Sequence, residues 1–126
     1  MYVAKYFHKS RLKCQCGCDI YNVCDDLLIR MDYARELYGR PIYCTSCCRC
    51  PAHNKEVGGM ENSSHITTES QPSEAMDLLC TNPYTAYDLV KCLYEAGFRR
   101  IIMYHNKPII HVDVDKYKPQ EVLRIY

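Results

Sequence analysis

The spacing of apolar residues along the chain predicts two amphipathic helices. Apolar side chains recur at intervals of three and four over residues 25–38, as one face of a helix requires. An aspartate can cap the start of this helix, and Gly39 followed by Pro41 ends it. A second helix begins at Asn82, with a proline in its first turn, and ends at Gly97.

Shorter apolar runs predict strands. Val, Ile, Tyr and Thr are typical of such segments, and we expect strands at 42–48, around Leu78-Leu79, at 100–104 and at 108–114. The last two are separated by a hairpin turn. Between them and the ends of the chain we expect an irregular entry segment at 1–22, a short helix at 51–57, a polar surface loop at 60–73 and an edge strand within 116–126.

These elements lack the alternation of strand and helix that builds a parallel sheet. The order predicts an α+β fold, with a largely antiparallel sheet flanked by helices, and the length of 126 residues suits a single domain over 1–126.

The strand around His111 carries the first candidate chemistry. Because side chains alternate along a strand, His111, Asp113 and Asp115 share one face and aliphatic residues form the other. Such a row can be the edge of a site backed by the core, or an ordinary solvated face. The spacing alone favours neither.

His65 and Asp77 extend this candidate site. A single loop histidine is usually only solvated, but Asp77 lies between apolar pairs, and a buried carboxylate needs a partner such as a cation, a helix end or an arginine. A catalytic zinc site commonly has three nitrogen or oxygen ligands and one open position. His65, Asp77 and His111 are our candidate ligands for Zn²⁺.

The net charge and the hydropathy of the chain limit the kinds of partner that we expect the protein to bind. A formal net charge of +1 gives no indication of nucleic-acid binding, and no apolar stretch approaches the roughly 20 residues that span a bilayer. The first residues lack the apolar core of a signal peptide. We therefore expect a monomer that is cytoplasmic as synthesised.

The ten cysteines fall mainly into two clusters. The clusters are Cys14/Cys16/Cys18/Cys24 and Cys44/Cys47/Cys48/Cys50. Four thiolates drawn from both could bind a structural zinc, although Cys-x-Cys is an unusual zinc spacing and a strand would turn neighbouring thiols to opposite faces. Buried apolar thiols are the favoured interpretation, and a thiol redox enzyme is a third.

A series of motifs in fixed order resembles a known family. The series consists of Thr-Ser-Cys-Cys-Arg-Cys-Pro-Ala-His-Asn at 45–54, Val-Gly-Gly at 57–59, Asn-Ser-Ser-His at 62–65, Ala-Met-Asp at 75–77 and His-Val-Asp at 111–113. Together these resemble the zinc D-Ala-D-Ala carboxypeptidase family of metallopeptidases, which shares its fold with the hedgehog signalling domain. The small branch of bacterial and phage cell-wall peptidases is the most similar, and the resemblance covers about 25–115.

The resemblance implies roles for individual residues. It implies zinc held by His65, Asp77 and His111, with Arg49 binding or polarising the carboxyl end of a peptidoglycan peptide. Ser63 would orient the loop. Some relatives place the proton-accepting acid three residues before the last histidine, but that position is Pro108 here. Asp113 is therefore the candidate base, and its alternative role is to orient His111 through a hydrogen bond.

Two departures from the family pattern concern the site. Asp77 lies twelve positions after His65, farther than is usual, so residues 69–74 resemble an insertion that a surface loop can absorb. In addition, Cys47-Cys48 replace the usual Gly-Tyr before Arg49.

The expected function is hydrolysis of peptidoglycan stem or cross-link peptides, of carboxypeptidase or endopeptidase type. The small size suits a phage-type lytic domain that is released to act on the cell wall. Two alternatives remain open at this point: an inactive metal-binding recognition module on the same fold, and a cysteine-rich structural zinc or redox protein.

Overall fold

A five-stranded sheet forms the centre of the molecule. The computed structural model describes all residues, 1–126, and the strand order across the sheet is β1-β2-β4-β3-β5. The strands are β1 (Cys44–Ser46), β2 (Ala75–Leu79), β3 (Arg100–Met103), β4 (Ile109–Asp113) and β5 (Val122–Ile125). All neighbouring pairs are antiparallel except β3 and β5, which are parallel. The predicted α+β fold with a largely antiparallel sheet is confirmed.

Four helices accompany the sheet. They are α1 (Lys9–Leu12), α2 (Asp25–Tyr38), α3 (Pro51–Glu56) and α4 (Pro83–Glu95). Two caps behave as the sequence predicts: Gly39 adopts φ 70° and donates its N–H to the Arg35 carbonyl, and the Asn82 side chain accepts from the Tyr84 N–H. The aspartate cap expected at the start of α2 is wrong: Cys24 is the N-cap residue and forms no side-chain capping hydrogen bond, and Asp25 and Asp26 lie within the first turn. None of the helices has both the length and the apolar character needed to cross a bilayer.

Two expectations about the first half of the chain were wrong. The entry segment contains α1, a four-residue helix too short to show an apolar period; it is capped by His8 and anchored by the fully buried Leu12. The strand expected at 42–48 ends at Ser46, because the next residues leave the sheet and bury their thiols. There the Cys48 N–H donates to the Leu12 carbonyl at 2.9 Å.

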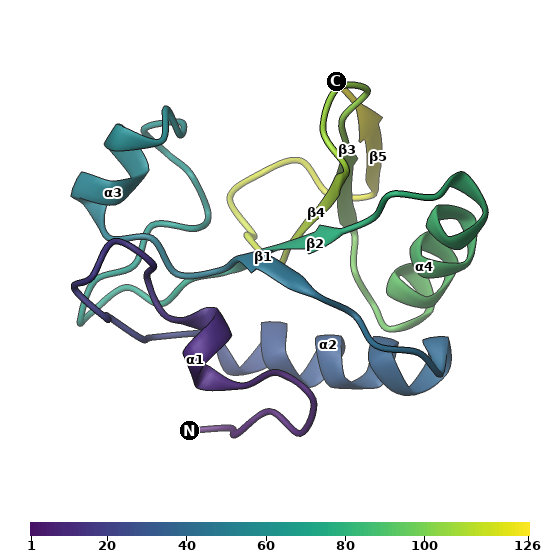
Figure 1. Cartoon of the computed structure of the whole chain (residues 1–126), viewed down its shortest axis with the longest axis horizontal. Coiled ribbons are helices and arrows are strands. Elements are labelled where there is room, and N and C mark those ends of the chain that lie inside the picture. The colour runs from purple at the N-terminus through teal and green to yellow at the C-terminus, as the bar shows by residue number, and fades with distance from the viewer.

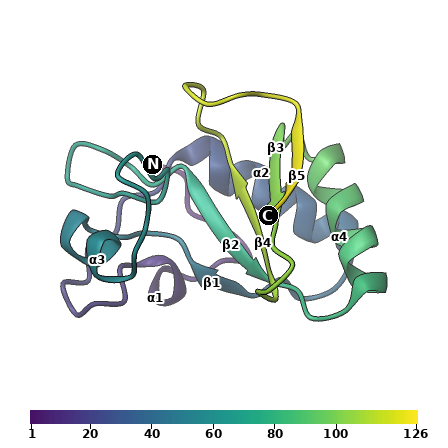
Figure 2. The ribbon, with the colours of Figure 1, turned by 90° about the horizontal axis from the view of Figure 1, so that it is seen from above.

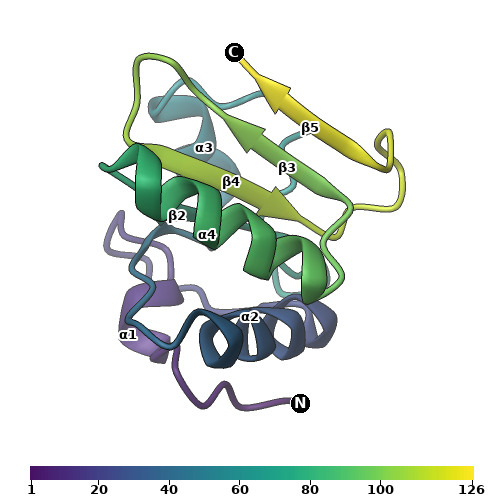
Figure 3. The same cartoon turned by 90° about the vertical axis from the view of Figure 1, so that its right-hand side faces the viewer.

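The two long helices pack together and cover one face of the sheet (Figure 3). The core beneath them includes Met76 and Leu78 of β2 and Ile110 and Val112 of β4, all with 0% exposure. Helix α3 lies away from the long helices, as two views show (Figures 1 and 2). The alternation of side chains therefore places the polar residues of β2 and β4 on the face opposite α2 and α4.

Candidate metal centre

Asp77 and His111 form the rigid part of the candidate site. They are direct partners across the antiparallel pair β2–β4, and His111 Nδ1 lies 3.0 Å from Asp77 Oδ1. Opposed residues on neighbouring strands are held at short, fixed separation by the ladder. Both side chains are largely buried, with exposures of 12% for His111 and 14% for Asp77.

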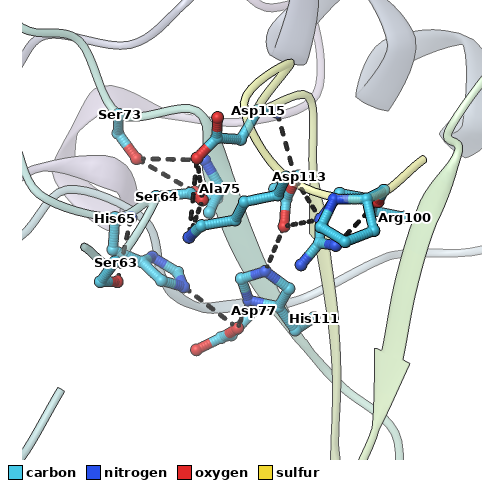
Figure 4. A network of polar contacts seen from close by, with 12 residues as sticks. Ser63, Ser64, His65, Ser73, Ala75, Asp77, Arg100, His111, Asp113 and Asp115 are labelled. Atoms are coloured by element: carbon cyan, nitrogen blue, oxygen red, sulfur yellow. Dashed lines mark hydrogen bonds and ion pairs between the residues drawn. The ribbon is translucent and has the colours of Figure 1, made fainter. Parts of the chain in front are cut away.

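His65 reaches the same carboxylate from the loop before β2 (Figure 4). Its Nε2 lies 3.2 Å from Asp77 Oδ1, and its side chain is 1% exposed. Backbone hydrogen bonds tie the loop to the segment before α3: the Arg49 N–H donates to the His65 carbonyl and the Thr67 N–H to the Arg49 carbonyl. The His65 N–H also donates to Ser63 Oγ at 3.2 Å. The ligand atoms of His65, Asp77 and His111 all lie within 4.8 Å of one another.

The longer spacing between His65 and Asp77 does not prevent this convergence. The extra residues form a turn in which the Thr68 N–H donates to the Gln71 carbonyl. The turn is fastened to the entry segment, because the Ser73 N–H donates to the Asn22 carbonyl and the Cys24 N–H to the Ser73 carbonyl. The surface loop therefore absorbs the additional length and returns the chain to β2.

A hydrogen bond of the His65 imidazole determines which of its two nitrogens faces the site. His65 Nδ1 lies 2.8 Å from the Cys47 carbonyl, which can only accept, so Nδ1 carries a proton and Nε2 presents a lone pair in the neutral ring. His65 Nε2 is buried and has no hydrogen-bond partner, although Asp77 Oδ1 is close. A nitrogen lone pair repels a carboxylate oxygen at this distance, and either a proton or a metal cation between them relieves the repulsion. Two imidazole nitrogens and one carboxylate oxygen are a donor set that fits zinc.

The protonation tendencies follow from the same contacts. Burial lowers the pKa of His65, which keeps the ring neutral and suited to a metal. Burial acts to raise the pKa of Asp77, but the adjacent His111 and His65 imidazoles outweigh it and hold that pKa well below its usual range. Burial also acts to lower the pKa of His111, but its hydrogen bonds to Asp113 and Asp77 leave that pKa raised.

Asp113 lies behind His111, away from the ligand cluster. His111 Nε2 lies 2.8 Å from Asp113 Oδ2, and Arg100 Nε donates to both oxygens of the same carboxylate at 3.0 and 3.1 Å. The Asp115 N–H is a further donor, and the Asp113 side chain is 0% exposed. A carboxylate with all these partners is suited to orienting His111. The geometry favours this alternative over the role of proton acceptor.

Arg49 carries a positive charge without a partner in the protein. Burial lowers the pKa of its guanidinium, and Asp77 acts in the opposite direction. Its Nε is buried with no hydrogen-bond partner, and none of the ion pairs in the chain includes it. The ion pair that would have made Arg49 purely structural is absent, so its planar donors remain available to a ligand.

Several groups that support the site were not identified from the sequence. Arg100 holds Asp113, and the Cys47 carbonyl holds both His65 and the Ser73 hydroxyl, which donates to it at 2.9 Å. A backbone carbonyl has no residue-type signal. Arg100 begins an apolar strand, where an arginine needs a buried partner, and that position was the available signal.

Asp115 and Ser64 form a second polar pair beside the site. Ser64 Oγ donates to Asp115 Oδ2 at 2.8 Å (Figure 4). Lys118 Nζ donates to Ser64 Oγ at 2.7 Å. Asp115 and Asp113 are both buried. The row of His111, Asp113 and Asp115 is therefore a packed polar network, and the solvated strand face is excluded.

Comparison of the chain with known sequences identifies its family. A sequence model of the peptidase M15 family matches residues 3–113, which is most of the chain and includes the first cysteine cluster that the motif series left outside. No curated protein matches significantly. The match confirms the resemblance to the zinc D-Ala-D-Ala carboxypeptidases and implies metallopeptidase activity on peptidoglycan-type substrates. The chain therefore belongs to the peptidase M15 family.

Proposed function

We propose that the protein is a zinc-dependent hydrolase of peptidoglycan stem or cross-link peptides, of D,D-carboxypeptidase or endopeptidase type. The observation that carries this proposal is the convergence of His65 Nε2 and His111 Nδ1 on Asp77 Oδ1, with the His65 nitrogen buried and unpartnered. Zinc held by these three residues would supply an activated water at near-neutral pH and polarise the scissile carbonyl.

The residues around the ligands have separate tasks. Asp113 keeps the Nε2 proton of His111 in place, so that Nδ1 faces the ligand cluster. The Cys47 carbonyl does the same for His65 through Nδ1. Preorganised ligands of this kind lose little freedom when the metal binds.

Arg49 binds the substrate in this proposal. A guanidinium without an internal partner can form a bidentate pair with a peptide carboxylate, or hydrogen bonds to a carbonyl. The backbone of Arg49 lies beside the His65 loop, joined to it in both directions by hydrogen bonds. The substrate group that Arg49 holds is thus positioned relative to a metal ligand.

A recognition module without catalysis remains the second candidate. The observation that favours it is the engagement of Asp113 by Arg100 and His111, together with Pro108 at the position where some relatives have an acid. In that case the site would bind muropeptides and leave them intact.

Incubation with purified muropeptides decides between these functions. The zinc-loaded protein should release D-alanine from pentapeptide monomers, split cross-linked dimers, or do both, and the products identify the type of peptidase. His111→Ala should be inactive, while His105→Ala, in the exposed turn after β3, should match the wild type. Binding without turnover by the zinc-loaded protein would establish the recognition module and exclude the peptidase.

A further inference from the structure

Four cysteines from two segments that are distant in the sequence lie close together in the structure. Cys14, Cys16 and Cys18 lie in the loop that follows α1, and Cys50 is the N-cap residue of α3. Their four sulfur atoms all lie within 4.8 Å of one another. The Sγ–Sγ separations are 3.5 Å for Cys14–Cys16 and 3.7 Å for Cys16–Cys50.

These separations match those of thiolates around a tetrahedral metal. With Zn–S bonds of about 2.3 Å, a regular tetrahedron sets the sulfurs about 3.8 Å apart. Four thiolates closed around one ion are the donor set of structural zinc sites, which leave no position for water. The unusual Cys-x-Cys spacing does not keep the sulfurs apart, and Gly17 between Cys16 and Cys18 adopts φ 103°, a conformation that residues with a Cβ rarely adopt.

The surrounding backbone supports negative charge on the sulfurs. The Cys50 N–H donates to Cys14 Sγ at 3.4 Å, and the His53 N–H donates to Cys50 Sγ at 3.3 Å. Hydrogen bonds from N–H groups favour the thiolate over the thiol. Two of the four sulfurs therefore receive donors from the first turn of α3 or its cap.

Burial as apolar thiols does not explain this cluster. Cys14 is fully buried, but Cys16 and Cys18 are exposed. By contrast, Cys47 and Cys48 of the second sequence cluster are buried, and both fit the interpretation as buried apolar thiols. Burial therefore accounts for Cys47 and Cys48 but not for Cys16 and Cys18.

We propose that Cys14, Cys16, Cys18 and Cys50 bind a structural zinc ion, distinct from the His65–Asp77–His111 site. This zinc fastens the loop after α1 to the start of α3. Cys50 follows Arg49 directly, so the zinc also fixes the backbone that carries the proposed substrate-binding arginine. The inference does not depend on peptidase activity.

Zinc content and X-ray absorption together test the proposal. The protein, prepared with zinc under reducing conditions, should lose one zinc per chain in the double variant C16S/C18S. Both positions are exposed, so the substitutions leave the core intact. The control Cys80→Ser, a half-buried cysteine outside the cluster, should retain the wild-type zinc content.

X-ray absorption spectra identify the atoms bound to zinc independently of the number of zinc ions per chain. His111→Ala should retain one zinc, with a sulfur shell at about 2.3 Å, and C16S/C18S should show only nitrogen and oxygen ligands at about 2.0–2.2 Å. Zinc with a sulfur shell in His111→Ala, at the wild-type count, would sustain this inference and defeat the proposed catalytic site. Absence of a sulfur shell in every variant, or a disulfide within the cluster under reducing conditions, would overturn the tetrathiolate site.

Discussion

Asp77 and His111 are direct cross-strand partners, and His111 Nδ1 lies 3.0 Å from Asp77 Oδ1. The β2–β4 ladder holds this pair, whereas His65 comes from a loop that is anchored by backbone hydrogen bonds. Two of the three proposed ligands are thus fixed by the sheet, and the third by its loop. Sites built on strands are positioned more accurately than sites built on loops alone.

Because Asp113 orients His111 in this proposal, its substitution should lower the affinity for zinc and not only the rate of hydrolysis. Asp113→Asn would weaken the hydrogen bond that orients His111 and leave Arg100 without its charge partner. Loss of such a supporting contact typically lowers metal affinity about 10- to 100-fold. Competition with a chelator of known zinc affinity measures the effect. Unchanged zinc affinity with abolished hydrolysis would instead make Asp113 the proton acceptor.

The unpaired guanidinium of Arg49 predicts a defect in substrate binding. A hydrogen bond to a charged group contributes about 1.5–3 kcal/mol, so Arg49→Ala should lower kcat/KM about 10- to 100-fold with zinc content unchanged. Arg49→Lys retains the charge but not the fork, and should recover only part of the activity. Steady-state kinetics with a muropeptide, alongside Arg124→Ala on exposed β5 as a control, provide the check. A wild-type kcat/KM in Arg49→Ala would remove Arg49 from the site.

Gly59 allows the close approach of the Asn54 side chain. A Cβ at Gly59 would lie 2.1 Å from Asn54 Oδ1, and Asn54 is buried with its Nδ2 donating to the Met60 carbonyl at 2.9 Å. Gly59→Ala should therefore lower the free energy of unfolding by about 1–3 kcal/mol, the usual cost of overpacking. Urea denaturation measures it.

A double-mutant cycle isolates this steric contact. In an Asn54→Ala background the Gly59→Ala substitution should be much less destabilising, because the obstructing amide is gone. Equal destabilisation in both backgrounds would show that the contact with Asn54 is not the cause.

Much of the fold could be predicted because its signals are local. Helices α2 and α4 have an apolar period and local end signals such as Gly39 and Asn82, and the predicted starts and ends agree closely with the structure, although no aspartate caps α2. Helix α1 was missed because four residues show no period. The parallel pairing of β5 with β3 depends on contacts far along the chain and leaves no local pattern.

In the candidate site, too, only the features with a local sequence signal could be predicted. Side-chain alternation on β4 correctly set His111 and Asp113 on one face, but it could not show that Arg100 fills the space behind them. The choice of His65 came from the motif series, because a loop histidine has no distinguishing spacing. The joining of Cys50 to a loop more than thirty residues earlier is a property of the folded chain only.

The zinc content of His111→Ala is the decisive measurement for the site formed by His65, Asp77 and His111. Elemental analysis of this variant, the wild type and the exposed-turn control His105→Ala compares chains that differ by a single imidazole. We expect His111→Ala to contain one zinc per chain fewer than the wild type and to hydrolyse no muropeptides, while the control retains the wild-type zinc content and activity. A folded His111→Ala variant with the full wild-type zinc content would contradict the site formed by His65, Asp77 and His111.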